Sequence, residues 1–179
     1  MNDRVSGAVH PFEGHRPTLA PDVFIAPGAQ VVGRVTIGPE SSVWYNCVLR
    51  GDVHEITVGA RSNIQDGTVV HVTGGRFGSH IGDDVLIGHL CMIHGCTIED
   101  GAFVGMKATV LDGCVIEKGA MLAAGALLTP GKRIPSGELW AGAPARYMRD
   151  LDEAQVAANR RGAEGYRQLA GRHRSSLIA

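Results

Sequence analysis

An aliphatic residue recurs every six positions through most of this chain, and this period restricts the possible folds more than any other feature. It differs from the 3.6-residue period of a helix and from the simple alternation of an ordinary strand. A chain that forms a short strand, turns a corner and repeats has such a period, and three strands complete one triangular coil of 18 residues. An antiparallel sandwich would instead need turn signals every 8 to 12 residues. The aliphatic positions are Val31, Ile37, Val43, Leu49, Val58, Ile64, Val70, Ile81, Ile87, Ile93, Ile98, Val104, Val110, Ile116, Leu122, Leu128 and Ile134.

The period is interrupted at three places. The step from Leu49 to Val58 is nine residues, which indicates an insertion of three within 51–57. The step from Val70 to Ile81 is eleven, which indicates an insertion of five within the Gly-rich segment 73–80. A third step, from Ile93 to Ile98, is one residue short. Insertions leave a solenoid as loops at its corners, where they often mark the binding face.

The period ends after about Pro144, which divides the chain into two parts. We predict an all-β solenoid over 1–147, including an extended lead-in that covers its base, and a C-terminal α-helical segment over 148–179. Charged and Ala-rich sequence with apolar residues at helical spacing predicts the helix over 150–177. Asp150 or Asp152 could cap its first turn.

Composition excludes several classes of protein. The 179 residues carry 17 Lys and Arg against 18 Asp and Glu, so charge gives no reason to expect nucleic acid or an anionic membrane as a partner. No run approaches the roughly 18 apolar residues of a membrane span, and the first 16 residues do not read as a signal peptide. The four cysteines form no CxxC pair and are interpreted as buried, reduced thiols in a cytoplasmic protein.

Two histidines occupy equivalent positions in successive coils. His71 follows Val70 and His94 follows Ile93, and their separation of 23 equals one coil of 18 plus the five-residue insertion. We therefore expect the two imidazoles to lie one above the other on the same face, with Arg50 one coil below His71. His89 lies around the preceding corner, one coil above Asp66.

These positions suggest a metal site. Three neutral imidazoles and one open position form the usual catalytic Zn²⁺ shell, and imidazole ligands also accept Fe²⁺ or Co²⁺. A trimer would bring the corner of one subunit against the face of the next, so that His89 of the neighbour could be the third ligand. The repeat arithmetic alone leaves this third ligand open. The remaining histidines are interpreted as surface or packing residues; they are His10, His15, His54, His80 and His173.

At these residues the chain resembles the γ-class carbonic anhydrase family of hexapeptide-repeat proteins. The resemblance extends from about residue 16 to residue 166 and implies that the parallel β-helix is left-handed. The matching strings are Leu49-Arg50-Gly51-Asp52, Asn63-Ile64-Gln65-Asp66-Gly67, Val70-His71-Val72, Ile87-Gly88-His89, Ile93-His94-Gly95-Cys96, Val104-Gly105-Met106 and Trp140-Ala141-Gly142-Ala143-Pro144-Ala145.

The resemblance also implies roles for particular residues. In this family the metal ligands would be His71 and His94 of one subunit and His89 of the next. Arg50 and Asp52 would form an ion pair between subunits. The resemblance places three further residues at the site. Gln65 would form a hydrogen bond with metal-bound hydroxide, and Asp66 would be a carboxylate that orients a ligating imidazole. Tyr166 would lie near the pocket, although it could equally be a packing aromatic.

By the same resemblance the protein would be a homotrimer that hydrates CO₂ to bicarbonate at three shared metal sites. It departs from the founding member of the family in two ways. The insertion at 73–80 is short and has no carboxylate, so a proton-shuttle glutamate is absent, and Val53 follows Asp52 where the founding member has glutamate. Three alternatives remain open: an acyl-CoA thioesterase, a hexapeptide acyltransferase with a histidine base, and a non-catalytic metal-stabilised trimer.

Overall fold

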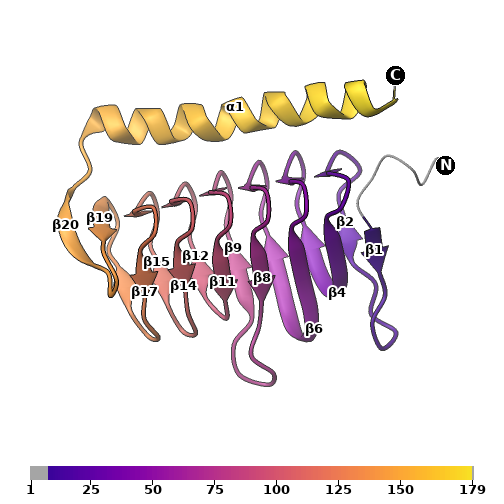
Figure 1. Cartoon of the computed structure of the whole chain (residues 1–179), viewed down its shortest axis with the longest axis horizontal. Coiled ribbons are helices and arrows are strands. Elements are labelled where there is room, and N and C mark those ends of the chain that lie inside the picture. The colour runs from indigo at the N-terminus through magenta and orange to yellow at the C-terminus, as the bar shows by residue number, and fades with distance from the viewer. Residues whose placement is uncertain (1–7, 179) are drawn as a thin grey trace.

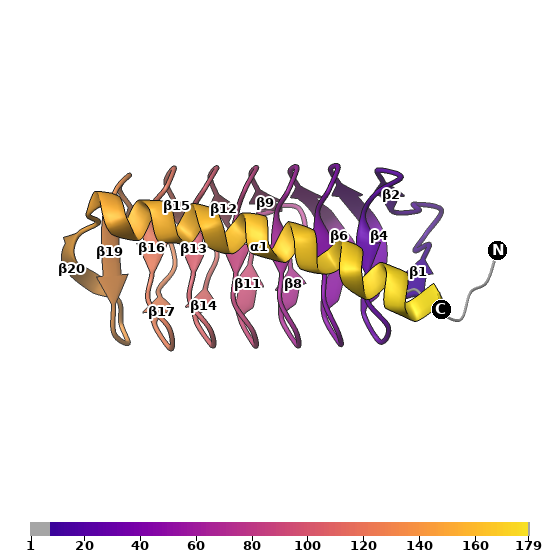
Figure 2. The ribbon, with the colours of Figure 1, turned by 90° about the horizontal axis from the view of Figure 1, so that it is seen from above.

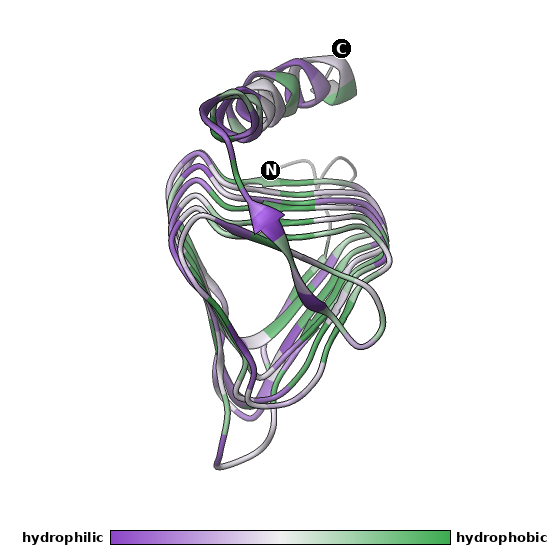
Figure 3. Ribbon diagram, turned by 90° about the vertical axis from the view of Figure 1, so that its left-hand side faces the viewer, coloured by the Kyte–Doolittle hydropathy of each residue, from purple (hydrophilic) through white to green (hydrophobic). Residues whose placement is uncertain are grey.

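The computed structural model describes residues 8–178, which form a left-handed parallel β-helix followed by one long α-helix (Figure 1). Seen along its axis, the solenoid is a triangular prism with flat faces (Figure 3). The solenoid and the C-terminal helix confirm the fold class that the six-residue period and the resemblance predicted. The first seven residues of the predicted lead-in, and Ala179, lie outside the described residues.

The strands are short because each spans one face of the triangle. In chain order the elements are β1 (Ala8–His10), β2 (Thr18–Leu19), β3 (Phe24–Ile25), β4 (Gln30–Ile37), β5 (Ser42–Val43), β6 (Val48–Val58), β7 (Asn63–Ile64), β8 (Val69–His71), β9 (Ser79–Ile81), β10 (Leu86–Ile87), β11 (Met92–His94), β12 (Thr97–Ile98), β13 (Phe103–Val104), β14 (Thr109–Val110), β15 (Val115–Ile116), β16 (Met121–Leu122), β17 (Leu127–Leu128), β18 (Arg133–Ile134), β19 (Glu138–Ala141), β20 (Arg146–Asp150) and α1 (Glu153–Ile178).

Pairing between coils has the register that the 18-residue coil requires. Thr97 pairs with Val115, and Thr109 pairs with Leu127, each 18 residues further on. One face consists of β3, β5, β7, β10, β13, β16 and β19 in order. The other two faces form one sheet because the long strands β4 and β6 continue around the corner between them.

The core is the interior of the prism. Ile64, Ile87, Val104 and Leu122 stack along one face, and each is completely buried. Aliphatic side chains from the other two faces fill the same interior. Burial of apolar surface stabilises a fold by roughly 25 cal/mol per Å². Because the chain has few aromatic residues, most of its buried apolar surface belongs to these aliphatic side chains inside the prism.

The two insertions take different forms. The three-residue insertion stays within β6, where Gly33 pairs with Gly51 and Val35 pairs with Ile56. Four residues of β6 therefore lie opposite Arg34 alone, so the expected loop is a bulge in a continuous strand. The five-residue insertion does leave the solenoid, as a loop closed by an antiparallel bridge between Thr73 and Phe77 (Figure 1).

Both ends of the solenoid differ from the sequence-based expectation. The lead-in is part of the first coil, because β1 and β2 pair in parallel with β4. After Pro144 the chain forms β20, antiparallel to β19, before the helix begins at Glu153. Asp150 ends that strand, so it cannot be the helix cap. Asp152 is the cap, since its Oδ1 accepts the Gln155 N–H at 2.7 Å.

Helix α1 returns along the whole length of the prism over the face that contains β3, β5, β7 and β10 (Figures 1 and 2). Its contact near the C-terminus is an aromatic cluster in which Trp44 packs edge-on against Phe24, Tyr166 and His173. A Cβ added at Gly162 would lie 3.0 Å from Leu86 Cδ1, so this glycine allows the helix to lie close to the sheet. Among residues 8–178, no helix has both the length and the apolar character needed to cross a membrane.

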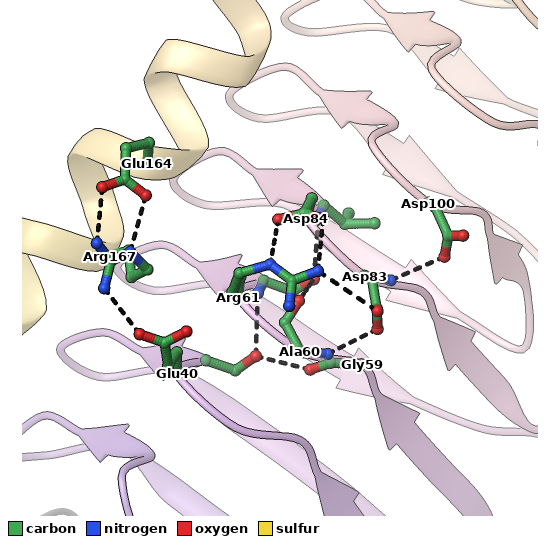
Figure 4. A network of polar contacts seen from close by, with 12 residues as sticks. Glu40, Gly59, Ala60, Arg61, Asp83, Asp84, Asp100, Glu164 and Arg167 are labelled. Atoms are coloured by element: carbon green, nitrogen blue, oxygen red, sulfur yellow. Dashed lines mark hydrogen bonds and ion pairs between the residues drawn. The ribbon is translucent and has the colours of Figure 1, made fainter.

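Ion pairs support the docking of α1 along one edge of this face (Figure 4). Arg167 on the helix contacts Glu164 on the same helix and Glu40 on the solenoid, at 2.7 Å each. Beside them, Arg61 pairs with Asp84 through two nitrogens. Because these groups are exposed, water screens each pair and its contribution is small, and the aromatic cluster is the stronger anchor.

Candidate functional site

The centre of the candidate site is a pair of facing imidazoles. His71 ends β8, His94 ends β11, and the two residues are paired in register as the coil arithmetic predicted. His71 Nδ1 lies 3.1 Å from His94 Nε2, and both side chains are partly buried. Two nitrogens on one tetrahedral ion, with bonds of about 2.1 Å, would be about 3.4 Å apart. The observed separation therefore fits two ligands of one metal ion.

A carboxylate holds the outer nitrogen of each imidazole. Asp52 Oδ1 lies 3.0 Å from His71 Nε2, and Asp112 Oδ1 lies 2.6 Å from His94 Nδ1. If each outer nitrogen donates its N–H to its carboxylate, both inner nitrogens carry a lone pair. Two lone pairs 3.1 Å apart need a shared proton or a bound cation between them. Carboxylates of this kind are the usual partners of ligating histidines.

The surroundings keep both carboxylates ionised. Burial tends to raise the pKa of Asp52, but hydrogen bonds from His71 and Arg50 outweigh it, and the pKa lies below its usual value. Burial likewise opposes the hydrogen bonds from His94 and Thr73 at Asp112, and the net effect again lowers the pKa. Both groups are therefore anions at neutral pH, as an imidazole-orienting carboxylate should be.

Asp112 is a functional residue that the sequence reasoning missed. It accepts a hydrogen bond from the Thr73 hydroxyl at 2.7 Å in addition to its contact with His94. The signal was available, because Asp112 lies 18 residues after His94 and therefore one coil above it. The same arithmetic that paired the histidines would have found it.

Arg50 pairs with its own neighbour in the single chain. Its guanidinium contacts the Asp52 carboxylate two residues away, whereas the resemblance predicted an ion pair between subunits. Arg50 remains half exposed while Asp52 is mostly buried.

His89 lies in a separate cluster at the preceding corner. Its Nδ1 is 2.7 Å from Asp66 Oδ2, which agrees with the prediction that His89 lies one coil above Asp66. Its Nε2 is 3.3 Å from the Tyr166 hydroxyl, which comes from α1. Burial raises the pKa of Tyr166, with a further contribution from the Asp66 charge, so the phenol stays protonated and can donate to His89.

Tyr166 therefore contacts both His89 and the aromatic cluster, and two substitutions can separate these two contacts. Its ring packs edge-on against Trp44 with centroids 5.3 Å apart. Tyr166→Phe keeps this packing and removes only the hydroxyl, so we expect a loss of about 1 kcal/mol in unfolding free energy. Tyr166→Ala also removes the ring and should cost about 2–4 kcal/mol. Urea unfolding of both variants measures the difference, and equal losses would contradict the packing role.

Gln65 is buried at the edge of the face covered by α1. Its Nε2 donates to Asn63 Oδ1 at 3.1 Å, which leaves its Oε1 as the acceptor. Asn63 is itself buried, and its Nδ2 has no hydrogen-bond partner within the described chain. The sequence singled out Gln65 but did not identify Asn63 as the residue that orients it.

A single chain thus contains two separate clusters. The first contains Arg50, Asp52, His71, His94 and Asp112, and the second contains Asp66, His89 and Tyr166. In the described part of the chain, no three His, Cys, Asp or Glu side chains are grouped so that they could hold a metal ion. Exposed apolar side chains lie near these clusters; they belong to Leu90, Met92 and Met106.

The cysteines are unsuited to the site. All four are free and buried, as predicted. Burial raises the pKa of Cys47 to about 12 and also raises the pKa values of Cys91, Cys96 and Cys114. Since the thiolate is the form that binds metals and attacks substrates, these thiols are inert at neutral pH.

Several known proteins are similar to this chain in sequence or in fold. The family model described as bacterial transferase hexapeptide (six repeats) matches residues 78–110 and 95–130. A Methanocaldococcus jannaschii relative, named as a probable carbonic anhydrase, is 55% identical over 152 residues, covering 85% of this chain and 95% of the relative. The solved structure of a hexapeptide transferase family protein from Anaplasma phagocytophilum is 47% identical, with a TM-score of 0.86 and coverage of 93% and 96%.

A longer relative is Gamma carbonic anhydrase 2, mitochondrial, of Arabidopsis thaliana, which is 52% identical over 164 residues and 89% of this chain. The chain spans about three fifths of the length of the Arabidopsis relatives. Because those proteins are named as mitochondrial, the cytoplasmic location of this chain stays a prediction. The identities over most of the chain nevertheless establish its relationship: it belongs to the γ-class carbonic anhydrase family of hexapeptide-repeat proteins.

Proposed function

We propose that the protein is a γ-type carbonic anhydrase, which hydrates CO₂ reversibly to bicarbonate in a homotrimer with three shared metal sites. The observation that carries this proposal is the pair of inner nitrogens of His71 and His94, 3.1 Å apart and each backed by a carboxylate. The relatives named as carbonic anhydrases support it. The sharing between subunits would explain why His89 lies in a separate cluster.

In this proposal His71 and His94 of one subunit and His89 of the next hold a Zn²⁺ ion, with Fe²⁺ or Co²⁺ as alternatives. When bound, such an ion lowers the pKa of a coordinated water to about 7 and so supplies hydroxide at neutral pH. Asp52, Asp112 and Asp66 each keep one imidazole oriented. The exposed Leu90, Met92 and Met106 would be covered by the neighbouring subunit.

The residues of the chain would orient the reactants but would not themselves carry the proton away. The Gln65 Oε1, fixed by the bond from Nε2 to Asn63, would accept a hydrogen bond from the attacking hydroxyl and so direct its lone pair toward CO₂. The segment 73–80 offers no carboxylate to carry the proton away, and the exposed Val53 cannot replace one. Proton release would therefore depend on buffer.

The proposal predicts a metal-dependent and buffer-dependent activity. Stopped-flow measurements should show CO₂ hydration by the metal-loaded protein, with kcat rising with imidazole buffer concentration at constant ionic strength. His94→Ala should lose both the metal, by elemental analysis, and the activity, because two imidazoles rarely hold Zn²⁺ tightly. Hydration that persists in His94→Ala at the wild-type rate would contradict the ligand assignment.

The second candidate function is acyl transfer or thioester hydrolysis, since the Anaplasma structure is described as a hexapeptide transferase family protein. A parallel assay with acetyl-CoA, with and without an amine acceptor, tests it. Thioester cleavage without CO₂ hydration would favour this alternative. Metal content with neither activity would favour a metal-stabilised structural trimer.

A further inference from the structure

One buried hydroxyl joins the backbones of the two strands that carry the paired imidazoles. Ser79 is the first residue of β9 and is completely buried. Its Oγ donates to the His71 carbonyl oxygen at 2.6 Å and accepts the Gly95 N–H at 2.9 Å. His71 carries one of the two imidazoles, and Gly95 directly follows His94, which carries the other. Ser79 therefore bonds to the main chain beside both imidazoles.

The three groups form a closed ring of hydrogen bonds. The Gly95 N–H also donates to the His71 carbonyl oxygen, at 3.1 Å, so each of these two groups bonds both to the other and to Ser79. Strand β8 ends at His71, and the inserted loop follows it before the chain returns at β9. The hydroxyl thus restrains the strand end at which the loop begins, where the backbone has no further strand residues to hold it.

The Gly95 backbone is also packed against the carboxylate that orients His94. A Cβ built on Gly95 would lie 2.4 Å from Asp112 Oδ1 and 2.9 Å from Phe77 Cβ, which leaves no space for a side chain. The same Asp112 oxygen lies 2.6 Å from His94 Nδ1. A shift of the Gly95 backbone would therefore displace the carboxylate and, with it, the His94 ring.

We propose that Ser79 is a positioning residue for the metal site. Its hydroxyl fixes the backbones of the two strands, so that the inner nitrogens of His71 and His94 keep the spacing that one ion requires. This inference rests on the proposed function, because it takes the two imidazoles as ligands of one metal ion. Both bonds of the hydroxyl go to main-chain atoms, so its removal alters the geometry of the ligands without removing a ligand.

Another corner of the solenoid offers a matched control. Ser41 is also buried, its Oγ donates to the Gly59 carbonyl oxygen at 2.6 Å, and it accepts the Ser62 N–H at 2.9 Å. Both distances equal those of Ser79, but neither partner lies next to a candidate metal ligand in the chain. Hydroxyls with only a structural role should therefore have similar effects when they are removed at the two positions.

The test compares full-length Ser79→Ala, Ser79→Thr and Ser41→Ala with the wild type. Urea unfolding should show similar losses of stability in the two alanine variants. Chelator competition should show metal binding about two- to tenfold weaker in Ser79→Ala, the equivalent of one neutral hydrogen bond, and the visible absorption bands of bound Co²⁺ should shift. Ser41→Ala should match the wild type in both measurements. Ser79→Thr should also match it, since Thr68 makes the same two bonds at its own corner, to the Gly88 carbonyl oxygen and from the Cys91 N–H.

A measurement without metal keeps this inference separate from the proposed function. In protein stripped of metal, the imidazole ¹⁵N NMR signals of His71 and His94 report the contact between their inner nitrogens. These signals should shift in Ser79→Ala and stay in place in Ser41→Ala. If the wild type binds no metal, the proposed function fails, and the ¹⁵N signals alone decide whether Ser79 sets the spacing of the pair.

Two results would overturn the proposal. One is a set of unchanged ¹⁵N signals in Ser79→Ala. The other is wild-type metal affinity with unchanged Co²⁺ bands in the same variant, which would leave Ser79 with the structural role of Ser41. If Ser79→Thr does not fold, the comparison of Ser79→Ala with Ser41→Ala decides the result.

Discussion

Mixed trimers that contain both His71→Ala and His89→Ala chains should bind about one metal ion per trimer, although trimers of either variant alone should bind none. In a cyclic trimer each site takes His71 and His94 from one subunit and His89 from the next. A His89→Ala chain still supplies the first pair, and a His71→Ala chain still supplies the third ligand. A mixed trimer contains one of the two variants twice. In either case, one of its three interfaces combines an unchanged His71 and His94 pair with an unchanged His89.

The experiment uses two affinity tags, so that only trimers containing both chains are purified, and elemental analysis then gives the metal per trimer. CO₂ hydration at about one third of the wild-type rate per trimer should accompany it. The matched control mixes His71→Ala with His94→Ala. Neither of these chains has an intact pair, so no interface can be repaired. Metal in the control, or none in the first mixture, would show that the sites are not shared in this way.

How far the sequence could predict this arrangement depends on what the repeat controls. The 18-residue coil fixes which residues lie above one another, so the sequence alone predicts His94 over His71 and His89 over Asp66, as the structure has them. It would equally have placed Asp112 over His94. Stacking within one chain is therefore predictable at the level of single residues, because the interior of the prism has no room for a shift in register.

Contacts that cross between elements were harder to predict. Gln65 and Asn63 are buried at the face that α1 covers, and the coil arithmetic says nothing about where that helix lies. Strand β20 was missed because its five exposed residues show neither the six-residue period nor a clear alternation.

Asp112→Ala should weaken metal binding by about 10- to 100-fold, although Asp112 would not itself be a ligand. The carboxylate fixes the ring of His94 through the 2.6 Å contact to Nδ1, which keeps Nε2 directed at His71. Without it, His94 can rotate and can place its proton on the inner nitrogen, and both changes must be reversed before a metal binds.

The conservative variant separates this positioning role from a general loss of stability. In Asp112→Asn the amide oxygen can still accept the His94 N–H, and the Thr73 hydroxyl can turn to accept from the amide nitrogen, so the loss should be smaller than in Asp112→Ala. Competition with a chromophoric chelator measures the affinity, and light scattering confirms the oligomeric state. Glu117→Gln, an exposed carboxylate paired with Arg133, serves as the control and should bind metal like the wild type. Wild-type affinity in Asp112→Ala would mean that Asp112 only secures Thr73 and the loop that begins there.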